Sequence, residues 1–438
     1  MIRVDPYLLV RAASLYLTLT ATIGLWVWRR PTSRAIAGAV LACCWNVPIV
    51  LALDIAATHE GWWQFDARGG LLMGTPVDLY LSWICLWGAI PSLAFPSLSM
   101  WRVTMIALAV DLVAMPAAAP VVRLGPMWLV GEGIGLTLGL LPAQLLARWT
   151  MRDQHLERRA FLQVVSFTGL LLFVLPTIVI EGSGSNWVNP ATRPLWQISL
   201  LVQLLSLPAL IGLTAVQEFV TRGGGTPVPF DAPRRLVTTG VYAYVGNPMQ
   251  LSAVVLLVLL GLVVWNPWLA AAGVMAHLYS AGLAGWDEGE DLRLRFGDTW
   301  TEYRRGVRRW VPRLRPWHRP DHPPARLYVS TSCNMCRDVA RWFERRDVRQ
   351  LAIVPAETHP SRALRRITYE PADGSRSASG IRAVARALEH VHLGWALLGF
   401  LLRLPVVCYL AQLLADASGA EPRTISTETC LSEGNHRG

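Results

Sequence analysis

Long apolar runs dominate this sequence, and they restrict the solvents in which the chain can fold. A helix that crosses a bilayer needs roughly 20 predominantly apolar residues. Nine stretches close to that length are Tyr7–Val27, Ala35–Leu53, Val77–Phe95, Thr104–Ala119, Met127–Leu146, Ala160–Ile180, Leu195–Ala215, Met249–Trp265 and Leu269–Ala284. Only 16% of the residues are charged, whereas soluble domains carry about 25%. The sequence therefore predicts an all-α polytopic membrane protein with about nine transmembrane helices.

The basic residues of the chain are all arginine, and they gather in alternate loops between the apolar runs. Arginines follow the first, third, fifth, seventh and ninth runs, whereas loops 58–74 and 181–193 contain few of them. Because cytoplasmic loops are enriched in Lys and Arg, this pattern predicts a multi-pass cell-membrane protein with a cytosolic C-terminal domain. No nucleic-acid recognition motif is present, so the lipid bilayer, and not nucleic acid, is the expected partner of the arginines.

The composition changes abruptly after the last apolar run. Residues 287–319 interleave Trp and Tyr with arginine, a pattern that suits a segment lying along lipid headgroups. A proline-rich linker follows and leads into a module of short predicted strands and helices. The predicted domains are an N-terminal transmembrane region over 1–194 with about six spans, a membrane domain with a cytosolic tail over 195–319, a small α/β domain over 320–423 and a disordered tail over 424–438.

A series of short motifs surrounds the last two apolar runs. In chain order they are Gly223–Pro227, Leu236–Tyr244, Asn247–Gln250, Asp287–Leu292, Phe296–Gly297, Trp300, Tyr303 and Val307–Pro316. The series resembles the isoprenylcysteine carboxyl methyltransferase and phospholipid methyltransferase family of integral membrane enzymes. The resemblance implies S-adenosylmethionine bound between the cytosolic ends of the last spans and the tail. It also implies an apolar or lipidated acceptor that enters from the bilayer.

Carried over position by position, the family pattern implies a set of site residues. The implied cofactor-binding residues are Gly240, Tyr242, Tyr244, Asn247, Pro248, Gln250, Glu288 and Tyr303. Tyr242 and Tyr244 are expected to face the cationic sulfonium or to pack against the adenine. Glu288 is expected to pair with the ammonium group of the cofactor and Arg309 with its carboxylate, which makes both residues catalytic candidates. Pro248 suits the first turn of a helix, where its missing N–H group has no partner to lose.

Some positions depart from the family pattern. Gly246 replaces an arginine, Gln250 a tyrosine, Gly289 a glutamate and Trp300 a tyrosine. A small residue does not replace the bidentate clamp of an arginine, so methyl transfer does not follow from the resemblance alone. With these losses the chain also resembles the methyltransferase-like membrane proteins of linaridin-type ribosomal-peptide pathways. That resemblance implies a non-methylating subunit that dehydrates or epimerises a peptide acceptor with a membrane protein partner, and the sequence leaves both alternatives open.

A CxxC motif follows the linker. Cys333 and Cys336 lie between a strand predicted over 326–331 and a helix predicted over 336–346. The N-terminus of a helix stabilises a thiolate, so both cysteines are catalytic candidates for redox chemistry. Zinc would need two further ligands, and His359 alone does not supply them, so no metal is expected.

The module over about residues 325–423 resembles the DCC thiol-disulfide oxidoreductase-like family, a thioredoxin-related group. The resemblance rests on the strand–CxxC–helix order, on Asp373–Gly374, on Gly380 before a helix and on an apolar helix over 395–415. It implies a small α/β thioredoxin-like fold. A third interpretation of the chain is therefore a membrane-anchored thiol-disulfide oxidoreductase, and a degenerate structural module is the alternative.

Carboxylic acids occur in or beside the apolar runs. They are Asp54, Asp78, Asp111, Glu132 and Glu218. Intramembrane carboxylates are costly, and each is by default a hypothesis of function. Asp111 and Glu132 lie farthest from the predicted span ends and are the better candidates, with an interhelical hydrogen bond as the alternative role.

Overall fold

The computed structural model describes residues 5–187, 192–228, 231–319, 321–360 and 364–422, and residues 283–287 by their backbone alone. Within these ranges seven helices are long and apolar enough to cross a membrane, and one bent pair of helices is an eighth candidate. The seven are Pro6–Arg29, Ser33–Glu60, Val77–Ala94, Met100–Ala117, Trp128–Met151, Leu156–Gly182 and Leu195–Gly223. The prediction of a mainly helical, polytopic membrane protein is confirmed.

The last two expected spans form a helical hairpin. α11 (Pro248–Val263) has 16 residues, and α12 (Pro267–Tyr279) has 13. α12 continues without a break through a π-helical turn over Ser280–Ala284 into the next helix, which begins at Gly285. In the turn between α11 and α12, Asn266 accepts a hydrogen bond from the Leu269 N–H (3.0 Å). Within the described residues, seven of the nine expected spans are therefore long apolar helices, and the last two form this hairpin.

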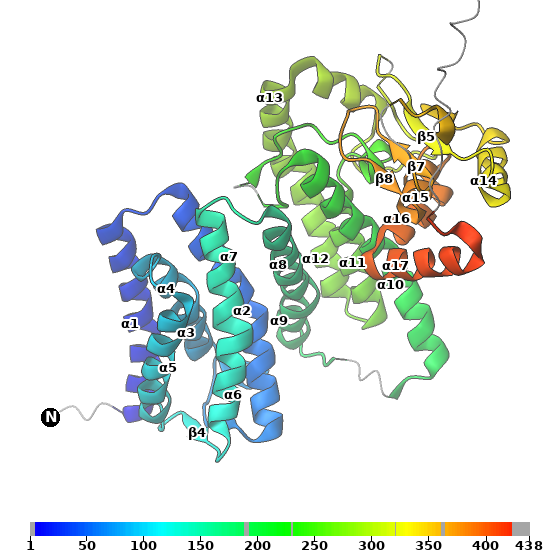
Figure 1. The fold of residues 1–438 in the computed structure, drawn as a ribbon. Coiled ribbons are helices and arrows are strands. Elements are labelled where there is room, and N and C mark those ends of the chain that lie inside the picture. The colour runs from blue at the N-terminus through cyan, green and yellow to red at the C-terminus, as the bar shows by residue number, and fades with distance from the viewer. Residues whose placement is uncertain (1–4, 188–191, 229–230, 320, 361–363, 423–438) are drawn as a thin grey trace, which may run out of the picture. The chain divides into compact units, whose positions relative to one another are not determined.

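The chain divides into two compact units, of which the first contains residues 1–201, 224–233 and 255–275. Its helices before residue 195 are α1 (Pro6–Arg29), α2 (Ser33–Glu60), α3 (Val77–Trp87), α4 (Ala89–Ala94), α5 (Met100–Ala117), α6 (Trp128–Gly135), α7 (Leu141–Met151), α8 (Leu156–Gly169) and α9 (Leu175–Gly182). α2 contacts α3, α4, α7 and α8 and forms the centre of this unit (Figure 1). α1 buries no residue of its own, as expected of a helix that faces lipid.

Short features interrupt the helices of the first unit. The third expected span is divided into α3 and α4 at Gly88, where a β-carbon would lie 2.8 Å from the Cys43 Sγ. Antiparallel strand pairs form between helices: β1 (Trp63–Phe65) with β4 (Val122–Leu124), and β2 (Leu71–Leu72) with β3 (Thr75–Pro76). Strands of two or three residues are too short to display an alternating pattern, so the sequence does not predict them.

The second unit contains residues 202–223, 234–254 and 276–438. It therefore combines the segment after the last apolar run with the C-terminal module. α10 (Leu195–Glu218) ends in this unit and continues as a π-helical turn over Phe219–Gly223. α13 (Gly285–Gly306) carries the charged stretch predicted after the last span and bends at Gly297, where φ is 53°. The predicted disordered tail over 424–438 lies outside the described residues.

The C-terminal module consists of a small mixed sheet and helices. Its strands are β5 (Ala325–Val329), β6 (Leu351–Pro355), β7 (Thr368–Glu370) and β8 (Ala378–Ser379), in the order β6-β5-β7-β8. β6 is parallel to β5, whereas β7 is antiparallel to both β5 and β8. The helices are α14 (Asn334–Glu344), α15 (Ile381–Leu388), α16 (Leu393–Arg403) and α17 (Pro405–Ala415). The strand predicted over 326–331 matches β5, and the helix predicted over 336–346 matches α14, each within a few residues.

The apolar helix expected over 395–415 is divided in two. α16 and α17 meet at a bend of 92° between Arg403 and Pro405. Proline lacks the N–H group that would continue the helix, and its ring collides with the preceding turn. The prediction of one continuous helix is therefore wrong, and α16 and α17 turn around Leu404 instead.

A buried ionic cluster attaches the module to the end of α10. Glu218 is 0% exposed and accepts hydrogen bonds from Arg386 Nη1 (2.9 Å to each oxygen) and Arg403 Nη2 (2.8 Å). Arg403 Nη1 also donates to Glu389 at 2.6 Å. Burial alone would lower the pKa of Arg386, but Glu218 and Glu389 raise it above its ordinary value, so this guanidinium stays charged. Since such a cluster is stable only when all partners are present, it fixes the module within the second unit.

Candidate functional site

The motif segments come together through main-chain hydrogen bonds. Bonds of 2.9 to 3.0 Å join Gly246 N–H to Arg308 O, Asn247 N–H to Arg309 O, Arg313 N–H to Tyr244 O and Trp317 N–H to Ala243 O. The tail after α13 therefore runs alongside residues 243–247. This pairing places Arg309 next to the loop that precedes α11, although α11, α12 and α13 separate the two segments in sequence.

The three tyrosines of the implied site differ in their surroundings. Tyr303 is 1% exposed and donates a hydrogen bond from its hydroxyl to the Tyr242 carbonyl (2.8 Å). The Tyr244 hydroxyl donates to the Glu389 carbonyl (2.8 Å), so Tyr244 joins the loop to the module. The Tyr242 hydroxyl is buried and has no hydrogen-bond partner among the described residues. A buried polar group without a partner costs about 1–3 kcal/mol, so Tyr242 is the tyrosine whose hydroxyl has capacity left for a ligand.

Two arginines occupy the space beside the glycines that depart from the family pattern. A β-carbon on Gly289 would lie 2.6 Å from Arg309 Nη2. A β-carbon on Gly246 would lie 3.0 Å from Arg304 Nη1 and 3.2 Å from the Arg309 Cα. Burial raises the pKa of the Glu288 carboxyl, and the positive charges of Arg309 and Arg304 lower it. Positive charge is therefore present beside Gly246 even though the family arginine is missing there.

Sequence reasoning did not single out Arg304, which reaches Gly246 only through the fold. Arg304 Nη1 donates to the Val307 carbonyl (2.9 Å), and its guanidinium lies over the Trp300 ring, 5.6 Å from the centroid. An arginine over an aromatic face is held in place by cation–π attraction. The tryptophan at position 300, four residues before Arg304, is the sequence signal that could have pointed to this contact.

Asn247, Pro248 and Gln250 form the start of α11. Pro248 is the first residue of the helix, as its place in the sequence predicts. The Asn247 Nδ2 donates to Gln250 Oε1 at 3.1 Å, and the Asn247 carbonyl accepts from the Leu251 N–H at 3.0 Å. The hydrogen bond between the Asn247 and Gln250 side chains therefore fixes both at the start of α11. This is also where the Asn247 N–H binds the Arg309 carbonyl.

Gly240 begins the short 3₁₀ helix Gly240–Ala243, which also contains Tyr242. It has a φ of 61°, and a β-carbon there would lie 2.9 Å from the Glu218 carboxyl carbon, so the position requires glycine. Gly240 lines a cavity of about 270 Å³, which is bounded by the loop 235–243, the tail and the module. No other residue of the implied cofactor set lines this cavity.

A pair of histidines stacks in the wall of this cavity. The rings of His318 and His390 are nearly parallel, with centroids 4.9 Å apart. Burial, assisted by the neighbouring His390 and arginines, lowers the pKa of His318 to about 3. Burial also lowers the pKa of His390, whose ring nitrogens hydrogen-bond with the Tyr369 hydroxyl (2.9 Å) and the Arg349 carbonyl (2.8 Å). Both imidazoles are therefore neutral at physiological pH.

The second unit is expected to lose stability in mild acid. The pKa of His318 is about 3 in the folded chain and about 6.5 in an unfolded one. Its contribution to stability is therefore complete above pH ~6.5 and falls by about 1.4 kcal/mol per pH unit below that value. At pH ~5 this histidine alone should cost about 2 kcal/mol, measured as the free energy of unfolding in denaturant. The His318→Phe variant should show a weaker dependence, and an acid-insensitive wild type would contradict the expectation.

The CxxC motif follows β5 and opens α14, as the sequence predicts. Cys333 is the N-cap of α14, and its Sγ accepts a hydrogen bond from the Cys336 N–H (3.4 Å). Both cysteines are half-buried. An N–H group directed at the sulfur at a helix N-terminus stabilises the thiolate of Cys333.

No family model, curated protein or solved structure matches the chain. The family resemblances therefore stay predictions that rest on the motif residues.

Proposed function

We propose that this chain is an integral membrane, methyltransferase-like enzyme that binds S-adenosylmethionine beside α13. Its acceptor is apolar or lipidated and is modified at the cytosolic face. The observation that carries the proposal is the placement of Arg304 and Arg309 against Gly246 and Gly289, the neighbour of Glu288 in the chain, together with the buried Tyr242 hydroxyl, which has no partner among the described residues. These groups come from the loop before α11, from α13 and from the tail, the segments that the family resemblance names.

The side chains present fit the charged end of S-adenosylmethionine. That end carries an ammonium and a carboxylate, and when bound the cofactor supplies a methyl group on a sulfonium. Glu288 offers a carboxylate for the ammonium, and Arg304 and Arg309 offer guanidinium groups for the carboxylate. The Tyr242 hydroxyl supplies a further hydrogen bond. Methyl transfer from a sulfonium depends mainly on the positioning of the donor and the acceptor. These residues would hold the donor in position.

The arginine distribution supports the cytosolic location of this site. Arg304 and Arg309 belong to the arginine-rich stretch after the last apolar run, which the charge rule assigns to the cytosol. An acceptor dissolved in the bilayer would reach a site that adjoins membrane helices without entering water. This assignment of side is part of the proposal.

The second candidate is a non-methylating membrane subunit that dehydrates or epimerises a peptide with a membrane protein partner. The observation that favours it is Gly289, where Arg309 lies against the space in which the family carries a glutamate. With one carboxylate fewer, the site has an excess of positive charge that would suit an acidic or carboxylate-bearing peptide group.

Binding of S-adenosylmethionine to the detergent-purified full chain tests the proposed function. Equilibrium dialysis with labelled cofactor should give saturable binding to the wild type and much weaker binding to Asn247→Ala and Glu288→Ala. Wild-type protein that is folded but binds no cofactor would overturn the proposal and leave the second candidate.

A redox role for the C-terminal module is also proposed. The parallel β5–β6 pair, the antiparallel β7 and the CxxC motif at the start of α14 support a thioredoxin-like arrangement. Cys333 is the expected attacking thiol, because its sulfur receives the Cys336 N–H.

Cys333 is therefore expected to alkylate about tenfold faster than an unstructured peptide thiol at neutral pH. Iodoacetamide labelling of the full chain, with mass-spectrometric quantification at Cys333, measures the rate. Cys430 lies far along the chain and serves as the internal comparison. A Cys333 rate equal to that of a model peptide would leave the module with a structural role.

A further inference from the structure

The last helix of the C-terminal module, α17, has two different faces. On one face Cys408 is buried, and the Gln412 side chain accepts a hydrogen bond from the Ile381 N–H (2.9 Å). The side chains of the other face are apolar and 48 to 70% exposed, and they are Val406, Tyr409, Leu410, Leu413 and Leu414. Steps of three and four residues place side chains on the same side of a helix. α17 is therefore amphipathic, and its polar side chain is turned toward the module.

The exposed face of α17 carries no charge. None of the 11 residues of α17 is charged, whereas α14 exposes the ion pair of Arg341 and Asp338 on its surface. The neighbouring helix α16 also exposes leucines, Leu398 and Leu401, and its only charged residue, Arg403, is buried in the ionic cluster. An extended apolar surface without charges is typical of a contact with another protein or with a membrane.

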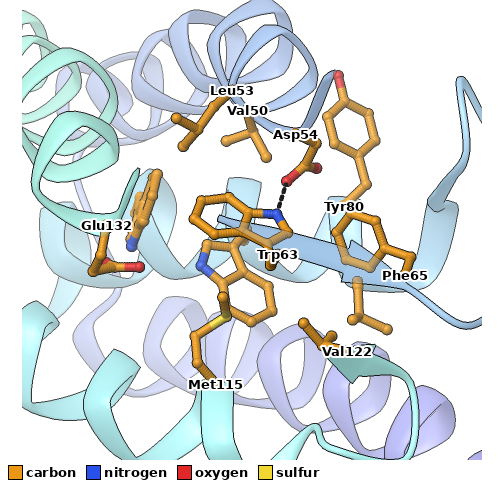
Figure 2. A pocket seen from close by; sticks show the side chains of 12 residues that line it. Val50, Leu53, Asp54, Trp63, Phe65, Tyr80, Met115, Val122 and Glu132 are labelled. Atoms are coloured by element: carbon orange, nitrogen blue, oxygen red, sulfur yellow. Dashed lines mark hydrogen bonds between the residues drawn. The ribbon is translucent and has the colours of Figure 1, made fainter. Parts of the chain in front are cut away.

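The membrane helices of the first unit have the same arrangement of polar and apolar groups. Asp54 and Glu132 line an internal cavity of only about 30 Å³, and Figure 2 shows them on two sides of the Trp63 ring. The outer sides of these helices expose apolar residues such as Leu17 on α1 (68%) and Val113 on α5 (71%). Polar groups that face the interior and apolar groups that face outward suit a lipid environment. α17 follows this arrangement, and its leucines are exposed to a similar degree.

The place of α17 in the second unit favours lipid as the partner of its exposed face. Ala396 and Phe400 of α16 belong to one buried cluster with Ala215 of α10, and α10 is part of a helix long and apolar enough to cross a membrane. At the end of α16, Arg403 donates a hydrogen bond to Gln217 Oε1 (3.1 Å) in the last turn of α10. The chain then bends by 92° into α17. α17 therefore begins beside the end of a membrane-crossing helix.

The length of α17 determines how it can contact the bilayer. Its 11 residues cover about 16 Å at 1.5 Å per residue, which is too short for a hydrocarbon core of about 30 Å. An amphipathic helix that does not span the bilayer lies along the interface, with its apolar face among the acyl chains.

We propose that α17 lies in this way in the leaflet at which α10 ends, and that its exposed apolar face contacts phospholipid acyl chains. The contact is a second attachment of the module, in addition to the ionic cluster around Glu218. It requires neither cofactor binding nor a reactive Cys333, so it is independent of the proposed functions.

Photocrosslinking from the exposed face of α17 tests this proposal. The full chain carries p-benzoylphenylalanine in place of Leu410 or, in a separate variant, in place of Leu414, and is reconstituted into liposomes of phosphatidylcholine and phosphatidylglycerol. Irradiated benzophenone reacts with nearby C–H bonds, so mass spectrometry of the labelled peptide identifies the molecule in contact. Both side chains are exposed, so the replacement leaves the core of the module intact. Both peptides should gain the mass of a phospholipid.

Two further positions calibrate the yield of lipid adduct. Leu207 is exposed on α10 within a membrane-crossing helix, and the probe placed there should also be labelled by lipid. Arg341 is exposed on α14, and the probe there should give at least about fivefold less lipid adduct than at Leu410. If the probe at Leu207 captures lipid and the probes at Leu410 and Leu414 capture no more than the one at Arg341, the proposal is overturned. Crosslinks from Leu410 and Leu414 to a second copy of the chain would also overturn it, because protein would then cover this face.

Discussion

Replacing Glu218 with alanine is expected to destabilise the second unit by about 3–5 kcal/mol. Glu218 is fully buried at the end of α10, and it is the shared acceptor of Arg386 and Arg403. Without it, two guanidinium groups remain in a site from which water is excluded. Limited proteolysis at increasing denaturant concentrations measures the effect. The module of the variant should become susceptible to cleavage at lower denaturant concentrations than that of the wild type.

Glu302→Ala is the matched control for this substitution. Glu302 belongs to the same unit, is 36% exposed and pairs with Arg319 at 3.4 Å. An exposed ion pair contributes about 0–1 kcal/mol, so the control should change little. If Glu218→Ala were no more destabilising than Glu302→Ala, the ionic cluster would not be what fixes the module to α10.

Replacing Glu288 with glutamine is expected to weaken S-adenosylmethionine binding by about 10- to 100-fold. The substitution keeps the shape of the side chain and removes the charge that would face the ammonium group. It also removes the negative charge that interacts electrostatically with Arg304 and Arg309. Isothermal titration of the detergent-purified full chain gives the affinity ratio directly.

Glu290→Gln is the control for this second substitution. Glu290 lies on the same helix, is 48% exposed and pairs with Arg293 at 2.7 Å, so affinity should not change. S-adenosylhomocysteine has the same amino-acid end and lacks the sulfonium charge, and its binding should respond to Glu288→Gln to the same extent. A loss confined to S-adenosylmethionine would move Glu288 from the ammonium to the sulfonium and contradict the assignment.

The long apolar helices could be predicted because hydrophobic length is a local property of the sequence. Leu195–Ala215 was expected as a span, and α10 begins at Leu195 and continues to Glu218. The extra turn carries a carboxylate whose arginine partners lie far away in the sequence. No local sequence pattern predicts such a pairing. The sequence therefore identified Glu218 as a carboxylate beside an apolar run and did not predict its role.

The limits of sequence reasoning also appear in the motif region. Gly246 and Gly289 suggested a site that lacks an arginine and a glutamate. The sequence shows which residues stand at these positions, and it does not show which side chains of other segments lie beside them. The tail folds back and brings Arg304 and Arg309 against both glycines, which depends on main-chain pairing between distant segments. The proline at position 405 was visible in the sequence, yet the size of the bend there, 92°, was not.

Photolabelling with the cofactor tests the proposed site most directly. Ultraviolet irradiation of the purified full chain with tritiated S-adenosylmethionine, followed by peptide mapping, reports which residues the cofactor touches. The label should fall on peptides from residues 240–250 or 288–309, and excess unlabelled cofactor should abolish it. A label that competitor does not remove, or one found only within residues 1–201, would contradict a cofactor site formed by Tyr242, Glu288 and Arg309.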